Sequence, residues 1–207
     1  MPNKEPKPIA TGPPALPASA SLPYGKPPPP PTHSRESSMT LPEDLRQLLL
    51  AFNEHGVEYL IVGGYAVGTY AEPRATKDLD LFIRSEMANS EAVFRALAVY
   101  GAPIAGLTPA DFRDDPHSVF QIGQPPARVD ILQYIDGVEF DEAWEHRTET
   151  AVAGVPAHII SPEHLIQNKL KSGRMRDLAD VEAIREAQGD RDAEAESQRQ
   201  NHPHKPV

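Results

Sequence analysis

Two aspartates stand close together in an otherwise apolar run, KDLDLFIR, which spans residues 77–84. Side chains alternate between the two faces of a β-strand, so Asp78 and Asp80 would point the same way, roughly 6.5 Å apart along the strand. Two neighbouring carboxylates resist joint ionisation unless a cation lies between them. Mg²⁺ binds carboxylate oxygens and completes its shell with water and phosphate oxygens. The pair therefore predicts a magnesium site, with Mn²⁺ as the alternative ion.

A pair of glycines, Gly63 and Gly64, precedes these acids where a buried strand turns into a helix. Backbone N–H groups and the helix dipole favour a phosphate at such a turn, and glycine lets the phosphate approach the main chain closely. A third acid, Asp130, lies within another apolar run, ARVDILQYI. If its strand neighbours that of Asp78 and Asp80, three carboxylates converge opposite the glycine turn. Such a site suits phosphoryl or nucleotidyl transfer with one or two metal ions.

The rest of the chain must supply the elements that position these residues. Strands are predicted for EYLIVGG, KDLDLFIR, HSVFQIG, ARVDILQYI and GVPAHIIS. Helices are predicted for TLPEDLRQLLLAFNEHG, GGYAVGTYAE, residues 85–100 and FDEAWEHR, and a closing helix or helix pair for residues 161–188. In the last of these, Ser161 is an expected N-cap, with Pro162 at the first helical position. Strands interleaved with helices predict an α/β (α+β) fold built on one mixed β-sheet flanked by helices.

Composition places the ordered domain at residues 39–188. Residues 1–38 hold about half of the chain's 23 prolines. They bury too little apolar surface to offset their ordering entropy, so we expect a disordered segment. It is either a passive tail, a segment before a true start at the following methionine, or a proline-rich ligand for a partner domain. Residues 189–207 are polar without periodicity and predict a second disordered tail. Thr40 and Glu43 would form a capping box at the start of the first helix.

The whole composition excludes several classes of protein. The chain has no cysteine, which rules out disulfides, zinc–thiolate sites and cysteine nucleophiles. A formal net charge of −10 argues against a surface broadly built for nucleic acid. No apolar run approaches the roughly 20 residues of a membrane span, and the N-terminus lacks the apolar core of a secretory signal. We therefore expect a soluble cytoplasmic protein that does not associate with a membrane.

The order of these motifs resembles the nucleotidyltransferase superfamily related to DNA polymerase β. Within it, the blocks VGGYAVGTYAEPRATKDLDLFI and SPEHLIQNKLKSGRMRDLADV are similar to the small bacterial AbiEii-type toxin nucleotidyltransferases. The resemblance covers nearly all of the predicted domain. It implies that Asp78, Asp80 and Asp130 form the metal site, and that Asp130 also helps to activate the acceptor hydroxyl. Gly63 and Gly64 would then bind the triphosphate of an NTP such as ATP.

The resemblance also bears on the residues around the acids. Many members of the superfamily have Ser at the second turn position, where this chain has Gly64, so backbone donors alone would contact the phosphate there. The helix that carries Lys169 would cross the pocket, and we expect Lys169 to face inward and contact the nucleotide. Arg74 and Lys77 precede the acid pair and are expected to contact phosphate, with a solvated loop as the alternative.

The last predicted helix carries acids that are expected to be structural. Asp177 and Asp180 stand at helical spacing from Arg174 and Arg176, and such pairs form ion pairs along one helix face. The sequence assigns these two acids no part in the chemistry.

The expected activity is Mg²⁺-dependent transfer of a nucleoside monophosphate from an NTP to an acceptor hydroxyl. The acceptor stays open between a tRNA 3′ end, a protein side chain and a small molecule such as an antibiotic. The AbiEii-type resemblance adds a toxin with an antitoxin partner as one form of this function. Two alternatives remain. One is a catalytically silent module that binds nucleotide or a partner, and the other is a sugar-nucleotide transferase with its own Asp-x-Asp metal site.

Overall fold

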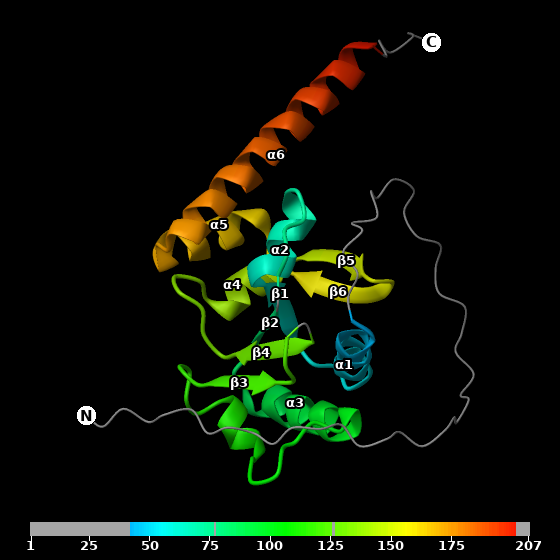
Figure 1. Ribbon diagram of the computed structural model, residues 1–207, viewed down its shortest axis with the longest axis vertical. Helices are drawn as coiled ribbons and strands as arrows, with labels where there is room; N and C mark the ends of the chain where they lie inside the picture. Colours follow the sequence, from blue (N-terminus) through cyan, green and yellow to red (C-terminus); the bar gives the residue numbers. More distant parts are fainter. Residues whose placement is uncertain (1–41, 77, 126, 202–207) are drawn as a thin grey trace.

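A computed structural model of the chain describes residues 42–76, 78–125 and 127–201 (Figure 1). The helices are α1 (Glu43–Glu54), α2 (Gly63–Tyr70), α3 (Met87–Tyr100), the 3-10 helix η1 (Pro109–Phe112), α4 (Phe140–Glu145), α5 (Pro162–Ser172) and α6 (Met175–Asn201). The strands are β1 (Tyr59–Val62), β2 (Asp78–Ile83), β3 (Val119–Ile122), β4 (Arg128–Leu132), β5 (Thr148–Val152) and β6 (Val155–Ile159). Within these described ranges, no helix has the length and hydropathy that crossing a bilayer requires.

The strands form one six-stranded mixed sheet in the order β3-β4-β2-β1-β6-β5. Strand β2 is central, antiparallel to β1 and parallel to β4. Strand β1 is parallel to β6, and β3 and β5 close the two edges as antiparallel partners. The predicted mixed sheet flanked by helices is confirmed. Its strand order makes β1, β2 and β4 neighbours, and these are the strands that carry or lead into the candidate residues.

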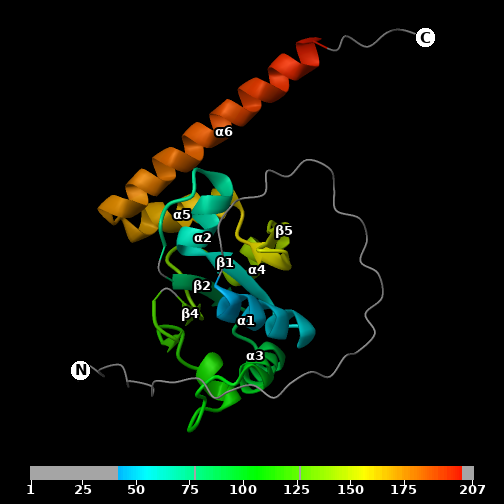
Figure 2. The ribbon, with the colours of Figure 1, turned by 45° about the vertical axis from the view of Figure 1, so that its right-hand side comes forward.

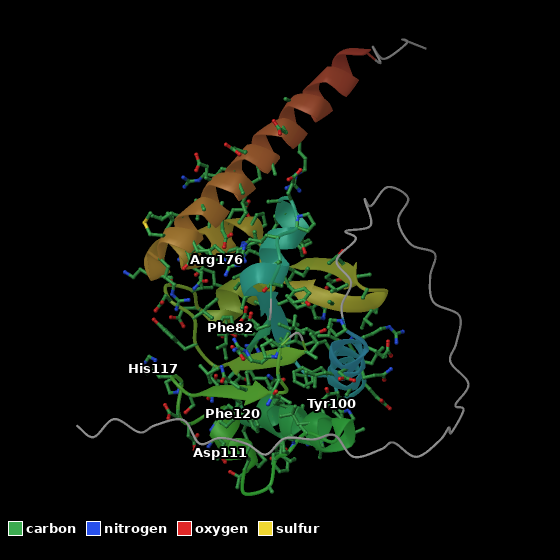
Figure 3. The ribbon with its side chains drawn as sticks, in the orientation of Figure 1. Phe82, Tyr100, Asp111, His117, Phe120 and Arg176 are labelled. Atoms are coloured by element: carbon green, nitrogen blue, oxygen red, sulfur yellow. The ribbon has the colours of Figure 1, made fainter. Side chains whose placement is uncertain are left out.

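Strand β2 separates an apolar face from an acidic one. Leu79, Leu81 and Ile83 are fully buried, whereas the two aspartates on the other face are only half-buried. This is the alternation that the sequence predicts for a strand with one face in the core. Phe82 is buried as well and stacks edge-on against Phe140 of α4 (Figure 3).

Helices cover both sides of the sheet. Helices α1 and α3 pack against each other on one side, and α2, α5 and α6 pack together on the other, with the sheet between them in both views (Figures 1 and 2). Helix α1 turns its apolar residues inward at helical spacing, as its sequence predicts, and the fully buried ones are Leu45, Leu48, Leu49 and Phe52. The second group of helices is the one that borders the acidic face.

The start of α5 follows the predicted chemistry closely. The hydroxyl of Ser161 accepts a hydrogen bond from the backbone N–H of His164, and Pro162 is the first helical residue. This cap fixes where the helix begins, because it satisfies one of the N–H groups that a helix start leaves without an intrahelical partner. The phase of α5, and with it the direction of Lys169, depends on this cap.

Three features differ from the expectation or lie beyond it. Strand β5 is absent from the sequence-based prediction, because its sequence TETAV is polar and every second residue is exposed at the sheet edge. Helix α6 continues past Gln188 to Asn201, although a disordered tail is expected there. The distal half of α6 projects beyond the rest of the described chain (Figures 1 and 2). That half needs no apolar face, so the sequence shows no hydrophobic periodicity that would predict a helix. Thr40 and residues 1–38 lie outside the described residues, and α1 begins at Glu43.

Candidate active site

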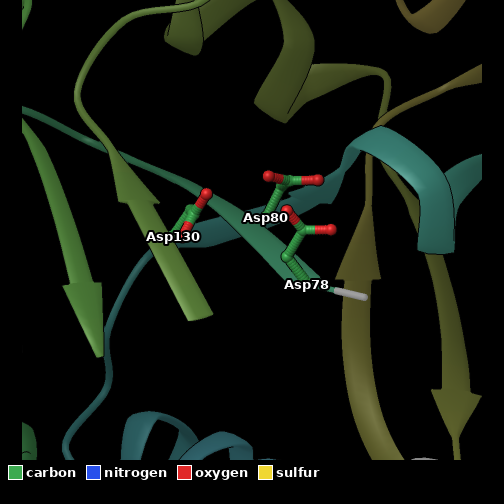
Figure 4. Close-up of side chains that lie close together, drawn as sticks. All are labelled: Asp78, Asp80 and Asp130. Carbon is green, nitrogen blue, oxygen red and sulfur yellow. The ribbon is translucent and has the colours of Figure 1, made fainter. Parts of the chain in front are cut away.

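Asp78, Asp80 and Asp130 meet on one face of the sheet (Figure 4). Strands β2 and β4 are parallel neighbours, and their register sets Asp80 directly beside Asp130. One carboxylate oxygen from each of the three acids lies within 4.8 Å of the other two. The adjacency of the two strands, on which the predicted convergence depended, is confirmed.

Burial and like charge govern the protonation of this cluster. Burial of the side chain, followed by the charges of Asp78 and Asp130, raises the pKa of Asp80 to about 7, although Arg128 and Lys169 act in the opposite direction. Burial also raises the pKa of Asp130, against the opposing effect of Arg128. A carboxylic acid that keeps its proton near neutral pH indicates that nearby positive charge does not compensate its ionised form. An additional cation at the site would supply that compensation.

The glycine pair begins α2 directly against the acids. Gly63 has a φ of +61°, and a Cβ built there would lie 1.9 Å from Oδ2 of Asp80. A Cβ on Gly64 would lie 2.5 Å from the hydroxyl oxygen of Thr76. The preceding residue, Val62, gives the helix no side-chain cap. The first N–H groups of α2 therefore have no capping side chain and lie beside the acids, where they are available to a phosphate.

Thr76 is a site residue that sequence reasoning missed. Its hydroxyl fills the space beside Gly64, the turn position where many members of the superfamily carry Ser. The same hydroxyl donates a hydrogen bond of 3.3 Å to the backbone carbonyl of Asp78. A hydroxyl is thus present at the second turn position after all, delivered from the connection between α2 and β2. No periodic signal in the sequence points to it.

Arg128 is the second residue that sequence reasoning missed. It precedes Asp130 by two positions on β4 and pairs in register with Asp78 on β2, so all three share one face. Its Nη2 donates hydrogen bonds to Asp78 and, at 3.1 Å, to Oδ2 of Asp130. Its Nε lies 3.1 Å from Oδ1 of Asp130. The alternation of side chains along a strand would have placed this guanidinium among the acids.

Arg74 and Lys169 meet at an acid on α6 rather than at the three-acid cluster. Arg74 donates two hydrogen bonds of 2.7 Å each to Asp180. The Nζ atom of Lys169 lies 2.7 Å from Asp180 and 2.9 Å from Asp177. Lys169 is only 5% exposed and so points away from solvent. Contact of either cation with a nucleotide stays a prediction.

The expected pairing of acids and arginines along α6 is wrong. Asp177 and Asp180 turn across to Lys169 and Arg74 instead of pairing with Arg174 and Arg176. The physical reason is burial. A lysine that is almost fully enclosed requires compensating carboxylates, whereas arginines at the surface are hydrated and gain little from an ion pair.

Helix α6 also holds the connection between α2 and β2. Arg176 donates a hydrogen bond of 3.2 Å to the carbonyl of Ala75 (Figure 3), and Arg191 donates to the carbonyl of Tyr70. This connection leads directly into the first acid of β2. Lys77, the remaining candidate for phosphate contact, lies outside the described residues.

Residues 41–203 match the family described as "Nucleotidyl transferase of unknown function (DUF2204)". The chain belongs to this family. As a nucleotidyl transferase it is an enzyme that transfers a nucleotidyl group, which confirms the reaction class expected from its residues. The narrower likeness to AbiEii-type toxins stays a prediction. No curated protein matches the chain.

Solved structures similar to this nucleotidyl transferase include two adenylyltransferase complexes. The crystal structure of ANT(2")-Ia in complex with adenylyl-2"-tobramycin is 17% identical, with a TM-score of 0.49 over 73% of this chain and 91% of that chain. The crystal structure of the lincosamide antibiotic adenylyltransferase LnuA with bound lincomycin is 17% identical, with a TM-score of 0.46 over 70% of this chain and 96% of that chain.

Proposed function

We propose that this nucleotidyl transferase moves a nucleoside monophosphate from an NTP to an acceptor hydroxyl, with Asp78, Asp80 and Asp130 holding Mg²⁺. The observation that carries the proposal is the convergence of these three carboxylates at the start of α2. They offer hard oxygen ligands within reach of a single ion, which is the donor set that Mg²⁺ prefers. The raised pKa of Asp80 supports the same assignment, because the cluster lacks compensating positive charge.

Each part of the site has a separate task in this mechanism. The N–H groups at the start of α2 bind the NTP phosphates beside Gly63 and Gly64. Asp130 accepts the proton of the acceptor hydroxyl, whose oxygen attacks the α-phosphorus. The bond between that phosphorus and the oxygen bridging to the β-phosphate breaks, and pyrophosphate leaves. Mg²⁺, when bound, neutralises the charge on the phosphates and polarises them.

Three basic residues are proposed to assist in nucleotide binding. Arg74 and Lys169 are both engaged by Asp180, so either would have to share or leave this partner to reach a phosphate. Lys77 immediately precedes Asp78 and is proposed for the same task from its position in the sequence.

The proposal is tested by incubating the chain with each NTP labelled at the α-phosphate, Mg²⁺ and fractionated cell extract. Label should enter one class of acceptor, which RNA, protein and small-molecule fractions distinguish, and Asp80→Asn should remove it. Nucleotide binding without pyrophosphate release from any NTP would contradict the proposal and favour a silent binding module. Turnover of a UDP-sugar would favour a sugar-nucleotide transferase instead.

A toxin with an antitoxin partner is one form of this function, supported by the AbiEii-type resemblance of the two sequence blocks. Expression of the wild-type chain should then arrest growth, and expression of Asp80→Asn at the same level should not. Equal growth of both strains would contradict the toxin role and leave the transfer chemistry unaffected.

A further inference from the structure

Arg128 lies where the three acids would hold a metal ion. Its guanidinium bridges Asp78 and Asp130, and the hydrogen bonds and ion pairs of the described chain give it no contact with Asp80. The Nε atom and Oδ1 of Asp130 are buried and 3.1 Å apart, yet neither forms a well-aligned hydrogen bond. The bridge is therefore close but incompletely satisfied. The side chain is 30% exposed, so part of it faces solvent.

In this arrangement the guanidinium would compete with a divalent ion for the carboxylates of Asp78 and Asp130. A divalent ion held by the three acids would draw on two carboxylates that Arg128 already engages, and a carboxylate that coordinates a metal is a poorer acceptor for a guanidinium that the metal repels. An ion bound by all three acids would therefore compete with Arg128 for Asp78 and Asp130.

We propose that Arg128 is an internal cation that competes with the divalent metal, and that the phosphates of the nucleotide take it over when the metal enters. The inference rests on the proposed function, because it assumes that the three acids bind the metal. Its consequence is that metal and nucleotide bind cooperatively. Either ligand alone meets Arg128 paired with Asp78 and Asp130, whereas both together supply the acids with a metal and the guanidinium with an anion.

Nucleotide phosphates are the anion that fits the displaced guanidinium. The planar fork of arginine matches phosphate oxygens as it matches a carboxylate. The start of α2, where phosphate is expected, contacts Asp80 directly, and Asp80 lies beside Asp130 in the register. A short swing toward the open side would therefore exchange two carboxylates for a phosphate in the same site. Arg128 is in this view a positioning residue that couples the two ligands.

The experiment compares wild type with Arg128→Gln, which removes the charge and keeps an unbranched polar side chain. Isothermal titration measures the affinity for Mn²⁺ alone and for Mn²⁺ with a non-hydrolysable NTP analogue. The matched control is Arg84→Gln, because Arg84 also bridges two carboxylates, Glu58 and Asp141, with a side chain that is 17% exposed. Arg128→Lys retains the charge without the fork, and it serves as the second variant if Arg128→Gln does not fold.

Arg128→Gln should bind Mn²⁺ alone at least about tenfold more tightly than wild type, because the competing cation is gone. The factor by which the analogue strengthens Mn²⁺ binding should fall by at least about tenfold, since that coupling runs through Arg128. Arg128→Lys should lie between wild type and Arg128→Gln, and Arg84→Gln should match wild type in both measurements.

Two results would overturn the inference. Unchanged or weaker binding of Mn²⁺ alone by Arg128→Gln would mean that the guanidinium does not compete. Undiminished coupling in either Arg128 variant would mean that the phosphates do not take it over. Both are distinct from failure of the proposed function, in which wild type binds no Mn²⁺ with or without the analogue and transfers no nucleotide.

Discussion

Asp80 is the acid whose charge is least compensated. Arg128 pairs with Asp78 and Asp130, whereas burial and two like charges raise the pKa of Asp80 to about 7. Between about pH 4 and pH 7, folded Asp80 keeps a proton that the unfolded chain releases. The folded state then binds more protons than the unfolded state, so the free energy of unfolding falls as the pH rises across this window.

Asp80→Asn should therefore stabilise the metal-free protein at pH 8 and abolish transfer. Asparagine removes the unfavourable ionisation, so the gain in melting temperature over wild type should shrink as the pH falls toward 5. Thermal melts in EDTA from pH 5 to 8 measure this. Asp78→Asn is the comparison and should show no such gain, because it deprives Arg128 of a partner. A melting temperature for Asp80→Asn well below that of wild type at pH 8 would contradict the assigned pKa.

The affinity for Mg²⁺ should rise with pH through the same range. A metal ligand must be deprotonated, so the proton on Asp80 competes with the ion below about pH 7. Titration of Mn²⁺ with a non-hydrolysable NTP analogue at pH 6 and pH 8 measures the difference, and binding should be tighter at pH 8. In Asp80→Asn the same change of pH should have little effect. Equal affinities at both values in wild type would show that Asp80 is not a ligand.

Asp130 should matter more for chemistry than for nucleotide binding. If it mainly accepts the proton of the acceptor, Asp130→Asn should bind Mg²⁺–NTP within about tenfold of wild type, or roughly 1.4 kcal/mol. Its transfer rate should fall at least about a hundredfold, the scale for loss of a positioned base. Isothermal titration and single-turnover rates separate the two effects. Asp78→Asn should lose both nucleotide binding and transfer rate. Equal loss of nucleotide binding in Asp130→Asn and Asp78→Asn would contradict the assignment of Asp130 to proton transfer and Asp78 to metal binding.

At the scale of elements, the turn from β1 into α2 brings backbone and acid into direct contact. Glycine is needed at position 63 for two reasons. Its φ of +61° is unfavourable for other residues, and its missing Cβ leaves room for the carboxylate of Asp80. Gly56 offers a matched comparison. Its φ is +65°, and a Cβ there would have no neighbour within 4 Å.

Gly56→Ala should cost about 1–2 kcal/mol in the free energy of unfolding, the backbone penalty alone. Gly63→Ala should cost clearly more, since the backbone penalty adds to a contact of 1.9 Å with the carboxylate of Asp80. It should also abolish metal binding, because Asp80 must move away. Urea denaturation and Mn²⁺ titration of the two variants check this. Equal destabilisation would show that the turn does not press against the acid.

At the scale of the whole molecule, α6 ties the C-terminal helices to the segment that enters the active-site strand. Burial acts to raise the pKa of Asp180, but hydrogen bonds from Arg74 and Lys169 outweigh it and lower the pKa. The ionised form therefore stabilises the fold above the unfolded pKa of about 4, and this contribution is lost as the pH falls through the lower folded value. Asp180 on α6 thus joins Lys169 of α5 to Arg74 in the connection between α2 and β2.

Asp180→Asn should destabilise the protein by about 3–5 kcal/mol at pH 7, the range for removing one partner of a buried ion pair. Lys169 and Arg74 would be left with a neutral neighbour in an enclosed site. Asp190→Asn is the control on the same helix, where the side chain is exposed, and it should change stability by less than about 0.5 kcal/mol. Chemical denaturation at pH 7 measures both, and a small effect of Asp180→Asn would show that α6 does not anchor the site.

The sequence by itself determined the local parts of this protein. Alternation along β2 placed Leu79 and Leu81 in the core and the two acids on the other face, and the glycine pair marked the turn into α2. The cap of α5 and the buried side of α1 followed from residue types at short spacing. These features are predictable because each depends on residues within one strand or one helical turn of each other.

Only the tertiary structure decided which charged groups meet. Arg128 reaches Asp78 across a separation of 50 residues, and Arg74 reaches Asp180 across 106. Helical spacing suggested local partners for Asp180, but burial of Lys169 determined the outcome. A charged side chain leaves water only where an opposite charge compensates it, and the chain reveals that partner only once it is folded. The convergence of the three acids was therefore predictable from the sequence, whereas the pairing of Arg74 and Lys169 with Asp180 was not.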